Sequence, residues 1–245
     1  MVHEENLKHL FAYIYKYDTF LKKYVNLQED EFVSLLKAMS EPERTQFVDA
    51  LTHFTAYMKA AESCRGIQEA QGIWTNLVLI LVFGLIEKIM SEENKLCFDY
   101  VRDNLDKCTG PAETQKILEE WREQYGANRR VHRFFVTHIL ESERSQILDT
   151  LKGNPYFSKI TQAQDPIKKF VDWIINCRGK FVHELGLDGL SESEQTQYVE
   201  PDKKGILHSG NAKWYPTVSI DQLVGYVVLG VFRKYNRDNI LTTIA

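Results

Sequence analysis

The chain has 245 residues, of which 44% are hydrophobic and 26% are charged, and its formal net charge is −4 at pH 7. These proportions are typical of a globular protein with one large or two small hydrophobic cores. The mildly acidic balance excludes a strong overall basic field, so any contact with nucleic acid has to be local. Residues 1–20 are acidic and amphipathic, which argues against a signal peptide, and we expect a cytoplasmic protein.

The cysteines and the most apolar segment disfavour two further classes of protein. The four cysteines form no C-x-x-C pair and have no histidine cluster beside them, so we expect no zinc site and no bound metal or cofactor. The most apolar run, Leu77–Ile86, is about half as long as the roughly 20 residues that a membrane-spanning helix needs. It therefore predicts a buried helix in a protein without a membrane span.

The pattern of residues 4–65 predicts three helices. Apolar residues recur at helical spacing over 4–25 and 29–40, and Ser40 with Pro42 marks the start of a third helix that runs to about residue 65. A boundary is expected after Arg65. The chain is thus divided into an N-terminal helical segment, residues 1–65, and a helical bundle, residues 66–245.

Residues 66–245 carry the remaining helices and one irregular stretch. A buried helix is expected near 70–91, and further helices over 91–108, 112–126, 128–153 and 165–186. Asp165 and Pro166 suit an N-cap and a first helical turn. Residues 187–219 are polar, with two short runs that suit a hairpin, and Ser219 is expected to cap a last helix. The predicted fold class is all-α, a helical bundle with a long loop or short hairpin before its final helix.

The stretch WIINCRGKFVHELG, residues 173–186, contains Arg178 and His183 five positions apart in an otherwise apolar run. Chance alone gives roughly 0.3 Arg-x4-His matches in this composition, and Arg133 with His138 forms a second match, so spacing by itself carries little weight. On a helix, Arg178 falls on the apolar face and His183 lies about 140° away. The surroundings of the pair must therefore decide its role.

Two interpretations of this pair are open. In the structural one, the buried guanidinium of Arg178 pairs with Glu87, the acid in the most buried helix, and His183 is a surface histidine. In the functional one, Arg178 and His183 converge on one phosphate. The imidazole then transfers the proton of a ribose 2′-hydroxyl or of the leaving oxygen, while the guanidinium holds the phosphate without a metal. A kink at Gly179, or a second copy of the chain, would bring the two side chains together.

The segment FVDWIINCRGKFVHELG resembles the signature helix of HEPN domains, in which an Arg-x4-His motif lies on a late helix of an α-helical bundle. LVFGLIEKIM is similar to the early helix of that fold, and the resemblance covers about residues 70–240. It implies a homodimer whose two motifs meet in a cleft and cut single-stranded RNA without metal, in toxin–antitoxin, phage-defence or RNA-processing systems. It also implies that Arg178 binds the phosphate and that His183 is catalytic.

Many members of that family carry a polar residue directly after the arginine, where this chain has Gly179. Asn176 or Lys180 is expected to supply the polar group, and Glu87 or Asn176 to orient the pair. The resemblance equally allows a non-catalytic member of the family that dimerises, binds a nucleotide or binds a protein such as an antitoxin. A purely structural helical protein is the third alternative.

Basic residues that suit an RNA backbone cluster in two other places, and they are Arg129, Arg130, Arg133, Lys203 and Lys204. Two phenylalanines follow the first group, and aromatic rings beside basic residues are typical of surfaces that bind single-stranded RNA. The alternative for both groups is a solvated basic surface.

Overall fold

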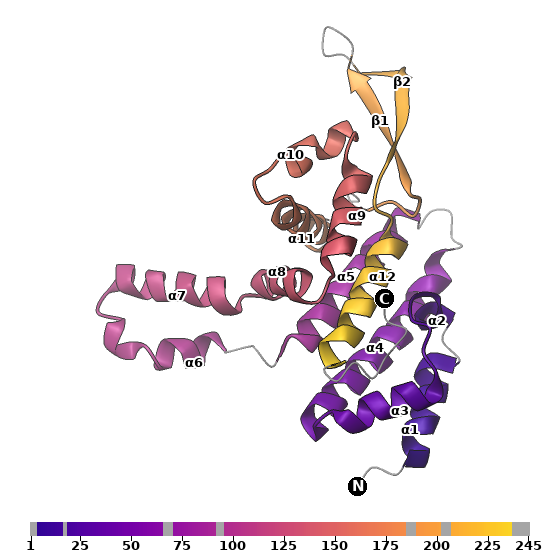
Figure 1. The fold of residues 1–245 in the computed structure, drawn as a ribbon. Coiled ribbons are helices and arrows are strands. Elements are labelled where there is room, and N and C mark those ends of the chain that lie inside the picture. The colour runs from indigo at the N-terminus through magenta and orange to yellow at the C-terminus, as the bar shows by residue number, and fades with distance from the viewer. Residues whose placement is uncertain are drawn as a thin grey trace.

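The structure is a computed structural model that describes residues 4–16, 19–65, 71–91, 96–184, 190–201 and 207–236. Within these residues the chain forms helices and one two-stranded antiparallel sheet (Figure 1). The all-α class is therefore confirmed. No helix in the described part of the chain is both long enough and apolar enough to cross a bilayer.

The N-terminal helices are α1 (Glu4–Phe11), α2 (Thr19–Tyr24), α3 (Glu29–Ala38) and α4 (Glu41–Arg65), with a π-helical turn over Ala12–Lys16. The first expected helix is thus interrupted, in a run of aromatic and β-branched residues whose helix propensity is low. Ser40 precedes α4 as expected. Its hydroxyl and its backbone N–H both donate to a carboxylate oxygen of Glu43, at 2.7 and 3.0 Å.

The central helix is α5 (Gln71–Ile89), and α4 and α12 (Ile220–Tyr235) pack against it (Figure 1). Buried side chains from both sides of residue 65 form one hydrophobic core. Phe47 of the N-terminal segment packs edge-to-face on Phe232 of α12, with ring centroids 5.3 Å apart. The expected boundary at residue 65 therefore falls between two helices, α4 and α5, that pack on each other.

The hairpin expected before the last helix is present. It consists of β1 (Gln195–Pro201) and β2 (Leu207–Pro216), which pair in antiparallel register with Val199 opposite Ala212. Ser219 caps α12 through a reciprocal pair of bonds with Gln222. The N–H of Gln222 donates to the Ser219 hydroxyl oxygen at 3.2 Å, and the N–H of Ser219 donates to the Gln222 side chain at 3.0 Å.

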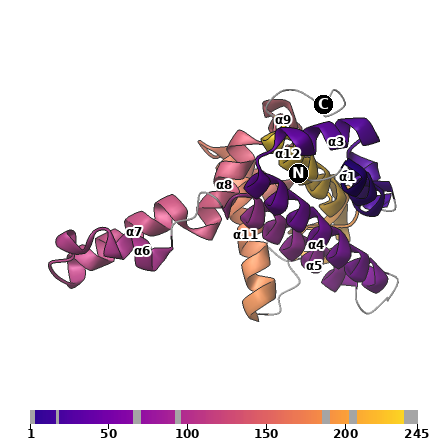
Figure 2. The ribbon, with the colours of Figure 1, turned by 90° about the horizontal axis from the view of Figure 1, so that it is seen from below.

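An arm projects from the body of the molecule (Figures 1 and 2). It comprises α6 (Cys97–Arg102), a 3₁₀ turn over Leu105–Lys107 and α7 (Pro111–Tyr125). None of the described residues of α6 is buried, and Phe98 is 74% exposed. Ile117 is the one buried residue among the described residues of α7, and the rings of Tyr100 and Tyr125 contact each other between α6 and α7 with centroids 5.6 Å apart.

The chain then returns to the body through α8 (Ala127–Thr137), α9 (Glu141–Leu151), α10 (Ser158–Thr161) and α11 (Pro166–Glu184). The sequence predicts one helix over 128–153, and the structure has two. The turn between them lies over Gly230 of α12, where a Cβ would be 3.2 Å from the carbonyl oxygen of His138. Arg233 holds this corner, because its two terminal nitrogens donate to the two carboxylate oxygens of buried Glu143 at 2.8 Å each.

Candidate functional site

Helix α11 carries the Arg-x4-His pair and begins where the sequence predicts. The Asp165 carboxylate accepts the backbone N–H of Lys168 at 3.0 Å, and Pro166 occupies the first turn. The helix continues through Gly179 to Glu184. The side chains of Arg178 and His183 therefore keep their angular separation of about 140°, and one copy of the chain does not bring them together.

Arg178 faces the body of the bundle. Its Nη1 lies 3.1 Å from Oε1 of Glu87 on α5, and its guanidinium carbon lies 5.2 Å from the ring centroid of Phe83. The side chains of Arg178 and Glu87 are 31% and 25% exposed, so water screens the pair in part. This contact is the one that the structural interpretation of the sequence expects, and it also fixes the orientation of the guanidinium.

His183 lies on the exposed side of α11 and lines a pocket of about 470 Å³. The pocket is lined by Tyr156, Trp173, Asn176, Cys177, Gly179, Lys180, His183 and Glu184. The imidazole of His183 forms no hydrogen bond or ion pair with any residue that the structure describes. The pocket thus brings His183 together with Lys180 and Asn176, two of the three predicted supporting residues, but not with Arg178 or Glu87.

Two aromatic residues of this pocket were not predicted as functional. Tyr156 precedes α10 and is 55% exposed, and Trp173 packs perpendicular to Phe157 with ring centroids 4.9 Å apart. Exposed aromatic rings beside basic side chains are suited to stacking a base. Trp173 could have been found from its place at the edge of the polar stripe of α11. Tyr156 has no such local signal, because it reaches the pocket only through tertiary packing.

The predicted basic cluster at the start of α8 divides into two roles. Arg129 and Arg133 line a second pocket, of about 160 Å³, between α8 and the N-terminal end of α11. Arg130 is not part of it. Its Nη1 donates to the carbonyl oxygen of Tyr125 at 2.8 Å, which ties the end of α7 to the start of α8. The predicted contacts of Lys203 and Lys204 lie outside the described residues.

Within the described part of the chain, no three His, Cys, Asp or Glu side chains gather closely enough to hold a metal ion. No protein-family model, no curated protein and no solved structure matches the chain. The candidate site is therefore defined by the contacts of its own residues, the pocket around His183 on one side of α11 and the Arg178–Glu87 pair on another.

Proposed function

We propose that the protein is a metal-independent endoribonuclease of the HEPN type, which acts on single-stranded RNA as a homodimer. The observation that carries the proposal is the position of His183. It stands exposed in a pocket that also presents the ammonium group of Lys180 and the amide of Asn176. Arg178 lies five residues before His183 on the same helix, and its ion pair with Glu87 holds the guanidinium in one orientation. A toxin–antitoxin or phage-defence setting, with an antitoxin as a further partner, belongs to this proposal.

The proposed reaction uses proton transfer and charge stabilisation only. The 2′-hydroxyl oxygen of a ribose attacks the adjacent phosphorus while the bond from phosphorus to the 5′-oxygen breaks. The imidazole of His183 takes the 2′-hydroxyl proton and, as imidazolium, returns it to the leaving 5′-oxygen, which gives a 2′,3′-cyclic phosphate and a 5′-hydroxyl. Lys180 precedes His183 by three residues on the same helix, so its ammonium group can offset the charge that builds up on the phosphate.

The proposed site combines Arg178 of one copy of the chain with His183 of a second copy, because a single copy keeps these two side chains apart. In a two-fold pair of α11 helices, the Arg178 side chain of one copy can face the His183 side chain of the other. The last turns of α11 offer a surface for this contact, because Val182 is 50% exposed. The site is therefore proposed to form between copies.

Mixing two inactive variants tests this arrangement. Arg178→Ala and His183→Ala, each inactive alone, form heterodimers in which one of the two sites has both residues. A 1:1 mixture is then expected to regain about a quarter of the wild-type cleavage rate. A mixture that stays inactive, while both variants remain folded and dimeric, contradicts a site shared between copies.

A non-catalytic HEPN-like module, which dimerises or binds a nucleotide or a protein partner, is the second candidate. It is favoured by the contacts of Arg178 with Glu87 and Phe83, since they give the guanidinium a structural role inside one copy. Such a module would be stabilised by RNA or a nucleotide without producing any cleavage product. A thermal melt with and without ligand, beside a cleavage assay, separates the two candidates.

A further inference from the structure

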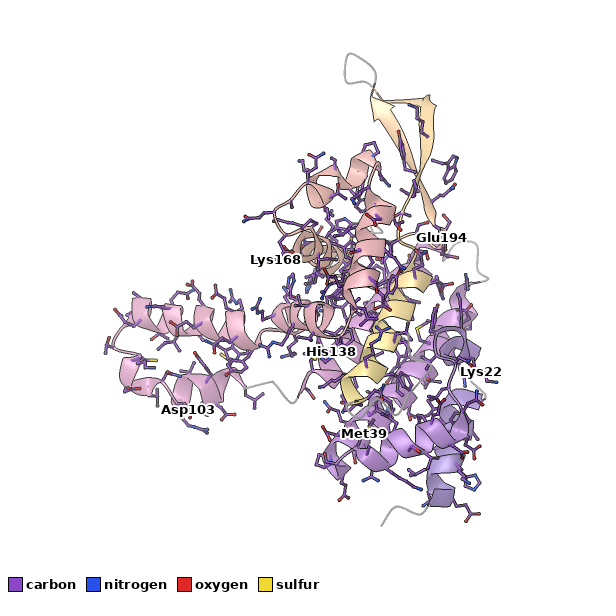
Figure 3. The ribbon with its side chains drawn as sticks, in the orientation of Figure 1. Lys22, Met39, Asp103, His138, Lys168 and Glu194 are labelled. Carbon is purple, nitrogen blue, oxygen red and sulfur yellow. The ribbon has the colours of Figure 1, made fainter. Side chains whose placement is uncertain are left out.

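The second pocket lies in the cleft between α8 and the N-terminal end of α11, where Figure 3 labels Lys168. Arg129, Arg133 and Lys168 line it, and Asp165 is the one acidic residue among the lining side chains. The side chains of Arg129 and Lys168 are exposed and form no ion pair with any described residue. Two of the three basic side chains of the cleft are thus left without an ion pair to a described residue, and Nη2 of the third, Arg133, donates to the carbonyl oxygen of Gln124 at 3.3 Å.

His132 also lines this cleft, and its imidazole contacts the carboxylate of Asp172. Nε2 of His132 lies 2.9 Å from Oδ1 of Asp172, and the His132 side chain is only 13% exposed. Its other ring nitrogen, Nδ1, has no hydrogen-bond partner among the residues that the structure describes. The contact with Asp172 fixes the orientation of the imidazole ring within the cleft.

We propose that this cleft binds a phosphate group, with Arg129 and Lys168 pairing with its oxygens beside Arg133 and His132, which line the same cleft. Guanidinium forks match the geometry of phosphate oxygens, and charge-assisted hydrogen bonds of this kind are the strong ones. The cleft volume of about 160 Å³ is below the roughly 300–1,000 Å³ of pockets that hold whole small ligands. It therefore suits a single phosphate group rather than an entire nucleotide.

The inference rests on the proposed function only for the source of the phosphate. Lys168 and His183 are separated by about 22 Å along the axis of α11. Asp172, Asn176 and Gly179 lie on the same side of the helix between them. An RNA strand that follows this side places one backbone phosphate in the cleft while another lies beside His183. Free phosphate, or a phosphate monoester, is the other source of the same chemistry.

The test compares the wild type with the double variant Arg129→Ala/Lys168→Ala, both of whose changes fall on exposed side chains. Lys116→Ala/Arg122→Ala on α7 is the matched control, because it removes the same charge from exposed positions that do not line the cleft. The ligands are inorganic phosphate and a single-stranded 2′-O-methyl RNA with a 5′-hydroxyl end, which lacks the attacking hydroxyl and so is not cut, titrated by calorimetry at constant ionic strength. The cleft variant is expected to bind at least about tenfold more weakly, and the control within about twofold of the wild type.

Loss of affinity for RNA assigns the cleft to a backbone phosphate, and loss for inorganic phosphate alone assigns it to a free phosphate or a monoester. Both results support the site. No binding of either ligand by the wild type, or equal losses in the cleft variant and the control, overturns it. Cleavage is scored separately with His183→Ala. If the wild type cleaves RNA but binds the two ligands no more tightly than the cleft variant does, this inference alone is refuted. If the wild type binds phosphate but does not cleave RNA, only the proposed function is refuted.

Discussion

Arg178 of α11 and Glu87 of α5 form an ion pair, with 3.1 Å between Nη1 and Oε1, although they lie 91 positions apart in the chain. The pair joins the late helix to the central one and turns the guanidinium away from the pocket of His183. The Arg-x4-His motif is thus divided between two sides of one helix, which is why the proposed active site needs two copies of the chain.

Breaking this ion pair is expected to destabilise the fold moderately. Arg178→Ala should lower the free energy of unfolding by about 1–3 kcal/mol, less than the roughly 3–5 kcal/mol of a fully buried pair, because both side chains are partly exposed. Urea denaturation measures the change. His183→Ala, an exposed position, should stay within about 0.5 kcal/mol of the wild type. Equal stabilities of the two variants would contradict the structural role of Arg178.

The buried pair between Arg233 and Glu143 should contribute more to the free energy of unfolding than the Arg178–Glu87 pair does. Their side chains are only 13% and 9% exposed, and Arg233→Met removes both guanidinium hydrogen bonds to the carboxylate of Glu143, which then keeps, among the described residues, only its bond from the Leu140 backbone N–H. We expect a loss of about 3–5 kcal/mol in the free energy of unfolding. Arg122→Met on the exposed side of α7 is the control. A loss below about 1 kcal/mol for Arg233→Met would show that the pair does not hold the α8–α9 corner.

Two glycine substitutions are expected to change the stability of the fold in opposite directions. At Gly230 a Cβ would lie 2.9 Å from Cζ of Phe134 and 3.0 Å from Cδ1 of Ile139, so Gly230→Ala should cost about 1–3 kcal/mol. At Gly179 no atom outside the helix's own backbone lies within 4 Å, so Gly179→Ala should stabilise helix α11 by about 0.5–1 kcal/mol. Thermal or urea denaturation of both variants gives the comparison. Destabilisation by Gly179→Ala would indicate a bend in α11 that the continuous helix does not have.

The free energy of unfolding at alkaline pH should depend on the environment of Tyr24. Burial raises the pKa of the Tyr24 phenol well above its ordinary value, and the nearby carboxylate of Asp221 raises it further. In the unfolded chain the phenol loses its proton near pH 10, whereas the folded protein retains it, so its stabilising contribution is complete below about pH 10 and is lost above it. The stability of the wild type relative to Tyr24→Phe should therefore fall as the pH rises from about 9 to 11. A difference that is independent of pH would contradict the raised pKa.

Helix starts were predictable from the sequence because their determinants are local. Ser40, Asp165 and Ser219 each precede a helix and bond to a group three residues further on, and this pattern is visible in the chain itself. The Arg178–Glu87 contact was also predictable as one of two alternatives. Each residue is a charge in an apolar run, and such a charge needs a partner.

The α8–α9 corner and the cleft between α8 and α11 were not predictable in the same way. The turn after residue 137 follows from packing on Gly230, and nothing in its own sequence marks it. His132 and Asp172 meet across 40 positions of sequence, and neither stands out in its own helix. Such sites depend on which faces of two helices meet, and the period of apolar residues indicates a face but not its neighbour.

The central claim is that His183 is the proton-transferring group of a metal-independent ribonuclease. The most direct test is cleavage of a mixed single-stranded RNA in EDTA by the folded wild type beside His183→Ala, with the ends of the products analysed. Cleavage by the wild type only, leaving 2′,3′-cyclic phosphate ends, is the predicted result. No cleavage by the wild type, or equal cleavage by His183→Ala, would contradict the claim.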